Sequence, residues 1–162
     1  ELMLPLAESI NETARAVKKC QNCGILDTIN PCKICTSDMR STTTICIVED
    51  MADVWAFERS GYHKGFYHVI GGLLSASKNF TEQDLKLNFL KQRIEKNNIQ
   101  EIILALSATI EGQTTALVIK DSLEGLKIKI TQLAYGVPVG SEIHYLDDNT
   151  LGAALESRKD LG

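Results

Sequence analysis

The 162-residue sequence contains no apolar run that approaches the roughly 18 to 20 residues needed to cross a membrane. Its first residues also lack the basic start, apolar stretch and small-residue cleavage site of a signal peptide. We therefore expect a cytoplasmic protein with no membrane association. In that reducing compartment its five cysteines are not expected to form disulfides, so any regular cysteine spacing indicates metal binding or redox chemistry.

The motifs of several enzyme classes are also missing. There is no GxxxxGK(S/T) phosphate loop, no GxGxxG turn and no GxSxG nucleophile elbow. The three histidines have no metal-ligand spacing, and we expect His68 to be a locally hydrogen-bonded sheet residue. Nucleophilic catalysis has no positive support. The formal net charge of −4 argues against strong sequence-independent binding of nucleic acid by this chain alone.

Four of the five cysteines form two CxxC pairs, Cys20 with Cys23 and Cys32 with Cys35, separated by eight residues. The segment has too few apolar side chains to fold around a core of its own, so a cross-link must replace the core. Four thiolates can close around one ion at about 2.3 Å, and Zn²⁺ favours this all-sulfur shell. Redox dithiols or buried thiols are the alternative. We expect one structural Zn²⁺ per chain, because four thiolates leave no open coordination position; Cys46 is expected to be a core residue.

The hydrophobic pattern after residue 41 alternates between strands and helices. Strands are predicted at 44–48, 66–70, 101–106, 127–133 and 143–146, and helices at 51–60, 82–96, 114–123 and 149–158. The 82–96 helix is expected to place Leu85, Phe89, Leu90 and Ile94 on one face. An amphipathic helix over 5–19 precedes the cysteines. This order, with long crossovers, predicts an α/β fold with a mostly parallel sheet and helices on both faces.

Acidic residues gather at the predicted carboxyl edge of the sheet. Glu49, Asp50 and Asp53 follow the first strand, and Glu111 follows the third. Parallel sheets place ligands at this edge, so the four carboxylates are candidates for Mg²⁺ binding and phosphoryl transfer. The alternative is a solvated acidic loop in which Asp50 and Asp53 favour the start of a helix. The pattern alone leaves both interpretations open.

Seven motifs, taken in order, resemble those of the bacterial recombination mediator family RecR. They are the cysteine segment with Arg40, CIVE over 46–49, YHVIGGLLS over 67–75, EIILA over 101–105, IEGQTTA over 110–116, GVPVG over 136–140 and YLDDNTL over 145–151. The resemblance runs from about Leu6 to the end of the chain. Two departures are noted: the family usually has Asn-Pro-Thr at positions 107–109, and often Glu at His144.

The resemblance implies a fold of four parts. Residues 1–19 would be a linking helix, the remnant of an N-terminal helix-hairpin-helix domain, and 20–40 a four-cysteine zinc finger. Residues 41–136 would be a Toprim domain, and 137–162 a C-terminal strand-helix segment for oligomer contacts. Because the basic helix-hairpin-helix is expected to be missing, DNA binding by this chain is expected to be weak.

The resemblance also implies a function in DNA repair and recombination. It indicates a non-catalytic, clamp-like scaffold of the bacterial nucleoid, a homodimer or tetrameric ring, that works with RecO and RecF to load recombinase onto SSB-coated single-stranded DNA. Matched by position, the family's acidic pair that contacts RecO corresponds to Glu49 and Asp53. The glutamate of its Walker-B-like, Toprim-type segment corresponds to Glu111, and Glu49 matches the first Toprim glutamate.

Catalytic Toprim domains carry a DxD pair after the third strand, where this chain has Leu106-Ser107-Ala108-Thr109-Ile110-Glu111. A two-metal site needs several carboxylates that converge on ions about 3.5 to 4 Å apart. We therefore expect no catalytic residues and no essential Mg²⁺. A Mg²⁺-dependent Toprim phosphoryl-transfer enzyme, of nuclease or primase type, is the alternative.

Overall fold

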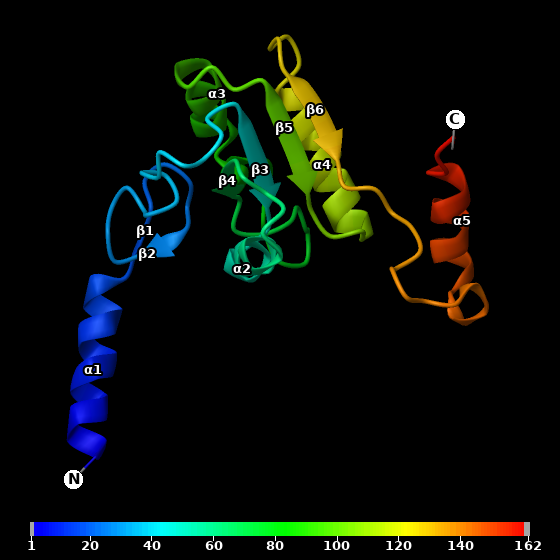
Figure 1. Ribbon diagram of the computed structural model, residues 1–162. Coiled ribbons are helices and arrows are strands. Elements are labelled where there is room, and N and C mark those ends of the chain that lie inside the picture. The colour runs from blue at the N-terminus through cyan, green and yellow to red at the C-terminus, as the bar shows by residue number, and fades with distance from the viewer. Residues whose placement is uncertain (1, 161–162) are drawn as a thin grey trace. The chain divides into compact units, whose positions relative to one another are not determined.

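The computed structural model describes residues 2–160 (Figure 1). The chain divides after Thr131 into two units. Within the described residues, no helix combines the length and the apolar character that a membrane crossing requires.

The first unit contains a four-stranded sheet with the strand order β4-β3-β5-β6. The strands are β3 (Thr44–Val48), β4 (Phe66–Val69), β5 (Glu101–Ala105) and β6 (Lys129–Gln132). Strand β3 pairs in parallel with both β4 and β5, so that Cys46 lies opposite Tyr67 on one side and Ile103 on the other. Figure 1 shows β6 pointing the same way as β5. The predicted parallel α/β sheet is confirmed.

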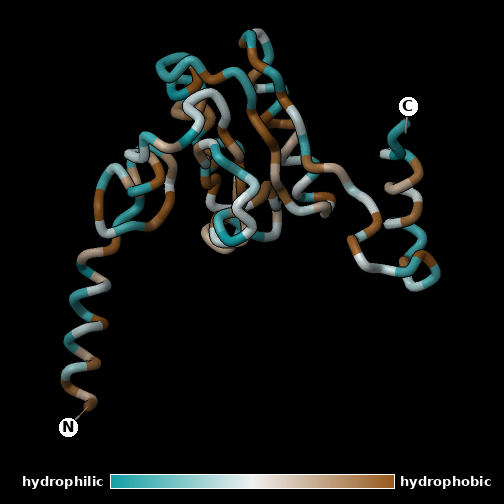
Figure 2. The backbone as a smooth tube through the Cα atoms, in the orientation of Figure 1, coloured by the Kyte–Doolittle hydropathy of each residue, from teal (hydrophilic) through white to brown (hydrophobic). Residues whose placement is uncertain are grey.

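The two faces of this sheet bury different sets of side chains, because successive residues of a strand point to opposite faces. Ile45 and Ile47 of β3 pack in a core with residues of helices α3 (Leu87–Lys96) and α4 (Ile110–Ser122). Cys46 and Val48 pack instead with α2 (Met51–Ser60) and the cysteine segment. Figure 2 shows the hydrophobic residues concentrated along the strands. Helices cover both faces, as predicted.

Two predicted helices differ from the observed ones for local reasons. Helix α4 begins four residues before the predicted start, because the Thr109 hydroxyl accepts a hydrogen bond from the Gly112 amide at 3.1 Å and caps it. Glycine is required there, since a Cβ at Gly112 would lie 1.9 Å from the Ser107 carbonyl oxygen. The 82–96 helix is broken at Lys86, whose φ of 51° is left-handed, into a 3₁₀ turn η1 (Glu82–Leu85) and α3.

The break at Lys86 changes which side chains face the core. Leu85, Leu87, Leu90 and Ile94 are buried, whereas Phe89, which was predicted to lie on the buried face, is exposed. A continuous helix would have kept one 3.6-residue phase from Leu85 to Ile94, and the left-handed residue resets that phase.

Helix α1 (Met3–Ala16) leads into the finger segment, a name used here for residues 20–40. The helix ends before the predicted residue 19, because Lys18 and Lys19 form strand β1 and pair antiparallel with β2 (Leu26–Asp27). The stripe of α1 that contains Leu6 and Ile10 is exposed. The predicted helix is confirmed, and no residue of its apolar stripe is buried.

Within its described residues, which end at 160, the second unit from Gln132 contains one short 3₁₀ turn and one helix. The predicted strand over 143–146 is wrong: Ile143–Tyr145 forms the turn η2, closed by hydrogen bonds from the Tyr145 amide to Glu142 and from the Leu146 amide to Ile143. Helix α5 (Asp148–Glu156) agrees with prediction and begins where the Asp147 carboxylate accepts the Thr150 amide at 3.0 Å. The C-terminal part is therefore a turn and a helix.

Candidate metal centre and acidic sheet edge

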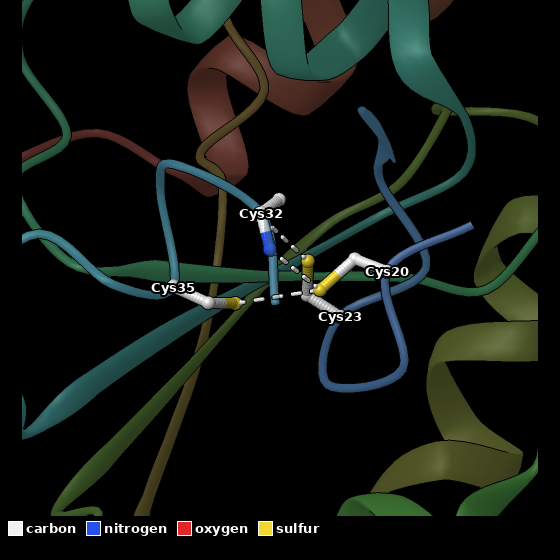
Figure 3. A group of neighbouring side chains, drawn as sticks. All are labelled: Cys20, Cys23, Cys32 and Cys35. Carbon is white, nitrogen blue, oxygen red and sulfur yellow. Dashed lines mark hydrogen bonds between the residues drawn. The ribbon is translucent and has the colours of Figure 1, made fainter. Parts of the chain in front are cut away.

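The four cysteines of the two CxxC pairs point toward one another (Figure 3). All four sulfur atoms lie within 4.8 Å of one another, with Cys23 and Cys32 3.5 Å apart and Cys20 and Cys35 4.0 Å apart. A tetrahedral shell with metal–sulfur bonds of about 2.3 Å separates sulfurs by about 3.8 Å, so the spacing fits a single ion. Three of the thiols are buried and Cys35 is half-buried. The predicted four-cysteine cluster is confirmed.

Backbone hydrogen bonds fold each CxxC pair into a tight turn. The Cys20 amide donates to the Ile25 carbonyl at 2.7 Å, and the Thr36 amide donates to the Cys32 carbonyl at 3.1 Å. The Cys20 sulfur accepts the amides of Asn22 and Cys32 at 3.4 and 3.3 Å. These two amides orient the Cys20 sulfur within the cluster.

The thiols of the cluster have divergent pKa values in the absence of a metal ion. Hydrogen bonding with Cys23 lowers the pKa of Cys35 to about 6, and the charge of Arg93 acts in the same direction. The same hydrogen bond, with burial, raises the pKa of Cys23 far above its usual range, and burial raises that of Cys32 to about 11. Metal binding by these thiols therefore releases protons.

The finger segment is fastened to the β4 edge of the sheet at several points. The Val69 amide of β4 donates to the Cys23 carbonyl at 2.8 Å. This approach depends on Gly24, whose φ is 81° and where a Cβ would lie 2.9 Å from the Val69 carbonyl oxygen. At the end of the segment, Arg40 donates to the Gly65 carbonyl at 2.8 Å and forms an ion pair with Glu58. The finger segment thus covers an edge that would otherwise be unpaired.

Arg93 of α3 was missed by the sequence analysis, although it lies beside the cysteine cluster. Its side chain is 8% exposed. Nη1 donates to the Tyr67 carbonyl at 2.5 Å, and Nη2 lies 3.9 Å from the Cys35 sulfur. The sequence did offer one signal. Arg93 lies three residues after the core residue Leu90 and one before the core residue Ile94, which places a cation near the buried face of the helix.

At the carboxyl edge of the sheet, Glu49 is held between neighbouring strands. Its carboxylate accepts the Ser107 hydroxyl at 3.2 Å, and its backbone carbonyl accepts the Gly71 amide at 2.8 Å. Asp50 and Asp53 form a reciprocal capping box at the start of α2. Asp50 accepts the Asp53 amide and Asp53 accepts the Asp50 amide, each at 3.3 Å. Asp50 also accepts the Ala52 amide at 2.8 Å, and Asp53 the Glu49 amide at 3.1 Å. The helix-start interpretation of these two aspartates is confirmed.

The acidic residues do not gather into a metal site. Glu111 is exposed in the first turn of α4. Across residues 2–160, the four cysteines are the one group of three or more histidine, cysteine, aspartate or glutamate side chains whose ligand atoms come together. The geometry therefore supports one metal centre, in the finger segment.

Two further polar residues of the sheet are core residues. Cys46 is buried, as predicted, and burial raises its pKa to about 12. His68 is a buried sheet residue, and burial with the nearby charges of Arg93 and Lys86 lowers its pKa to about 3. The expected local hydrogen bond is absent at one ring nitrogen, because Nδ1 has no partner within the described residues.

A parallel sheet of this order, with a four-cysteine cluster on its β4 edge, defines the class of the protein as a Toprim-domain protein with a four-cysteine cluster. Consistent with this class, a family model described as Toprim domain matches residues 43–134, and one described as RecR, C-terminal, matches residues 136–159.

Curated relatives identify the family. The "Recombination protein RecR" of Rhizobium meliloti is 49% identical over 158 residues, which is 98% of this chain and 79% of that protein. The proteins of the same name from Ruegeria pomeroyi and Hyphomonas neptunium are 48% and 47% identical and cover 99% and 98% of this chain and 80% and 79% of their own lengths. The chain belongs to the RecR family.

Proposed function

We propose that this chain is a non-catalytic scaffold of DNA recombination and repair that acts with RecO and RecF to load recombinase onto SSB-coated single-stranded DNA. The observation that carries the proposal is a four-thiol metal centre fastened to a Toprim sheet whose acidic residues do not converge. Family membership supports it, because the matched relatives are named recombination proteins. Such a protein acts in the bacterial cytoplasm, at the nucleoid.

The metal that we propose for the cysteine cluster is Zn²⁺, one per chain. The donor set is entirely sulfur, and the spacing suits a tetrahedral ion. With Cys20, Cys23, Cys32 and Cys35 all as ligands, no position is left for substrate or water, so the ion has a structural role. Its bound form holds the two CxxC turns together where the finger segment has little core.

The partner surface that we propose is the acidic edge at Glu49 and Asp53. Glu49 offers a half-exposed carboxylate positioned by Ser107, while Asp53 caps α2 and adds negative charge. Two residues after Asp53 in α2 lies Trp55, which is on a different side of the helix and has 64% of its surface exposed; tryptophan is a residue type that anchors many protein interfaces. Acidic charge steers a basic protein partner and disfavours DNA at this edge.

The test of this surface is binding of RecO at moderate salt by surface plasmon resonance. Glu49→Lys is expected to slow association and weaken binding on the order of tenfold. Glu95→Lys, on the exposed side of α3, reverses the same charge elsewhere and serves as the matched control. Asp53→Asn separates charge from capping, because an asparagine oxygen still accepts the Glu49 amide. Unchanged binding by Glu49→Lys would show that the partner surface lies elsewhere.

The rival function is a Mg²⁺-dependent phosphoryl-transfer enzyme that uses Glu49, Asp50, Asp53 and Glu111. We do not favour it, because the two aspartates are engaged in the capping box. Magnesium-dependent nicking of DNA or cleavage of RNA that disappears in Glu49→Ala would revive it. We also propose that bound Mg²⁺, if present near Glu49, is not essential.

We propose that the chain consists of four segments. They are a linking helix over 1–19, the finger segment over 20–40, a Toprim domain over 41–136 and an oligomer-contact segment over 137–162. The last carries exposed apolar side chains at Val139, Ile143 and Tyr145 that suit contacts between copies. We propose a homodimer or tetrameric ring with weak DNA binding by this acidic chain. The solution mass of the full chain and of a chain ending at residue 136 tests the assignment, since a monomeric full chain would contradict it.

A further inference from the structure

Arg93 is a buried cation that has no carboxylate partner. Its side chain is 8% exposed, and no ion pair with an aspartate or glutamate forms there within residues 2–160. Arg40, by contrast, pairs with Glu58. A buried charge is costly unless an opposite charge or several hydrogen bonds compensate it. The position of Arg93 therefore suits an anion other than a carboxylate, in addition to the hydrogen bond to Tyr67.

The cysteine cluster is such an anion. Four thiolates around one divalent ion keep two units of negative charge, and three of the four cysteines are buried. Nη2 of Arg93 lies 3.9 Å from the sulfur of Cys35. Cys35 is the half-buried member, so the guanidinium lies beside the sulfur ligand that is most accessible to solvent.

The guanidinium is held in this position by groups of the Toprim sheet. Nη1 donates to the Tyr67 carbonyl at 2.5 Å, and the guanidinium carbon lies 5.7 Å from the centre of the Phe66 ring. One nitrogen of the guanidinium therefore contacts the backbone of β4, and the other contacts the sulfur of a cysteine in the cluster. Lysine cannot reproduce this, because it carries a single point charge and lacks the planar two-armed geometry.

We infer that Arg93 is the counter-ion of the metal centre and a positioning residue that couples metal binding in the finger segment to the packing of α3 against β4. The inference rests on the proposed Zn²⁺ at the four cysteines. Since the coupling is reciprocal, metal loading stabilises the α3–β4 contact by the same free energy by which that contact tightens metal binding. The finger segment and the sheet then behave as one body when the metal is bound.

The test is the metal affinity of purified variants, measured by competition with a chromogenic chelator. Arg93→Met is expected to weaken Zn²⁺ binding 10- to 100-fold, the range for loss of groups that hydrogen-bond metal ligands. Arg93→Lys should recover part of that loss, because it restores the charge without the planar two-armed geometry. Lys96→Met removes a positive charge from an exposed position of the same helix and should bind as the wild type does.

The Co²⁺-substituted protein supplies a readout that mere packing would not change. Loss of the donor to Cys35 should shift the sulfur-to-cobalt charge-transfer bands in Arg93→Met and leave them in place in Lys96→Met. If Arg93→Met does not fold, Arg93→Gln decides, because it keeps a polar side chain that can donate hydrogen bonds and lacks the charge. A folded Arg93→Met or Arg93→Gln with wild-type affinity and spectrum would overturn the inference.

The outcomes also separate this inference from the proposed function. Wild-type protein that takes up much less than one Zn²⁺ per chain refutes the proposed metal centre itself. Wild-type protein that binds one Zn²⁺, with variants at Arg93 that bind it equally well, refutes only the role of Arg93.

Discussion

The finger segment and the sheet beside it are stabilised in different ways. Within residues 20–40, Ile25 is the one buried apolar side chain apart from cysteines. The sheet buries Ile45, Ile47 and Ile102 completely and adds core residues from α3 and α4. Apolar burial at about 25 cal/mol per Å² can hold the sheet, whereas the finger segment needs a cross-link. The same chain therefore carries one region that we propose depends on a bound metal and one that depends on its core.

The largest expected effect comes from breaking the metal centre. Cys32→Ser removes a completely buried ligand, and Zn²⁺ binding contributes about 10 to 16 kcal/mol in isolated finger peptides. We expect loss of bound metal and of hydrogen-exchange protection over residues 20–40, with β3 and β5 still protected. Cys46→Ala, a buried cysteine outside the cluster, should keep one metal per chain. A Cys32→Ser protein with full metal content and a protected finger segment would contradict the comparison.

The next effect tests the sheet. Ile102→Ala opens a cavity at a fully buried position of β5 and should lower the free energy of unfolding by about 2 to 5 kcal/mol. Denaturant titration by circular dichroism measures it, and metal content should stay at one per chain. The control is Ile110→Ala at an exposed position of α4, which should change stability by less than about 0.5 kcal/mol. Equal effects of the two variants would mean that the sheet core is not the source of stability.

A smaller effect is expected from pH. Burial lowers the pKa of His68 to about 3 in the folded state, so below its unfolded pKa of about 6.5 the unfolded chain binds the extra proton. The free energy of unfolding therefore has its full value above about pH 6.5 and decreases as the pH falls, by about 2 kcal/mol between pH 7 and pH 5. His68→Leu should flatten this dependence relative to wild type. His144→Leu, at an exposed histidine, should retain the wild-type dependence of the free energy of unfolding on pH. Any loss of metal at low pH affects the wild type and both variants alike, so it cancels when they are compared.

The smallest effect concerns the cap of α2. Asp50→Ala removes the acceptor for the Ala52 and Asp53 amides and should cost about 1 kcal/mol of unfolding free energy. Thermal unfolding measures this loss. Asp50→Asn keeps a capping oxygen and should lose only a few tenths of that amount. If Asp50→Ala leaves the free energy of unfolding unchanged, the capping bonds of Asp50 do not stabilise the protein. The capping interpretation would then be contradicted, and the acidic residues at this edge would be available for binding.

Several elements could be predicted because local pattern and tertiary environment agree. The bounds of β3 and α2 follow from a β-branched run, the Asp50 cap and Gly61, whose φ is 71°. Errors arose where a single contact overrode the pattern. Thr109 starts α4 early, Lys86 breaks the helix before α3, and residues 143–146 close on themselves without a neighbouring strand. Periodicity does not report such contacts, because each depends on a few atoms.

The candidate site divides in the same way. The four-cysteine cluster could be predicted from the sequence, because CxxC spacing is itself a short-range geometric constraint. The capping role of Asp53 was open to prediction only as one of two interpretations, since a carboxylate after a strand suits both a helix start and a metal. Arg93 escaped prediction, because it lies 58 residues from Cys35 in the chain and meets it only through the folded sheet.

The sequence by itself therefore determined the cysteine cluster, the parallel α/β sheet and the family. These depend on spacing, periodicity and ordered motifs, which are properties of neighbours along the chain. Tertiary structure alone decided that the finger segment covers the β4 edge and that Arg93 reaches Cys35. The physical reason is that a buried charge or an unpaired strand edge selects its partner by distance in space, and that distance exists only once the chain has folded.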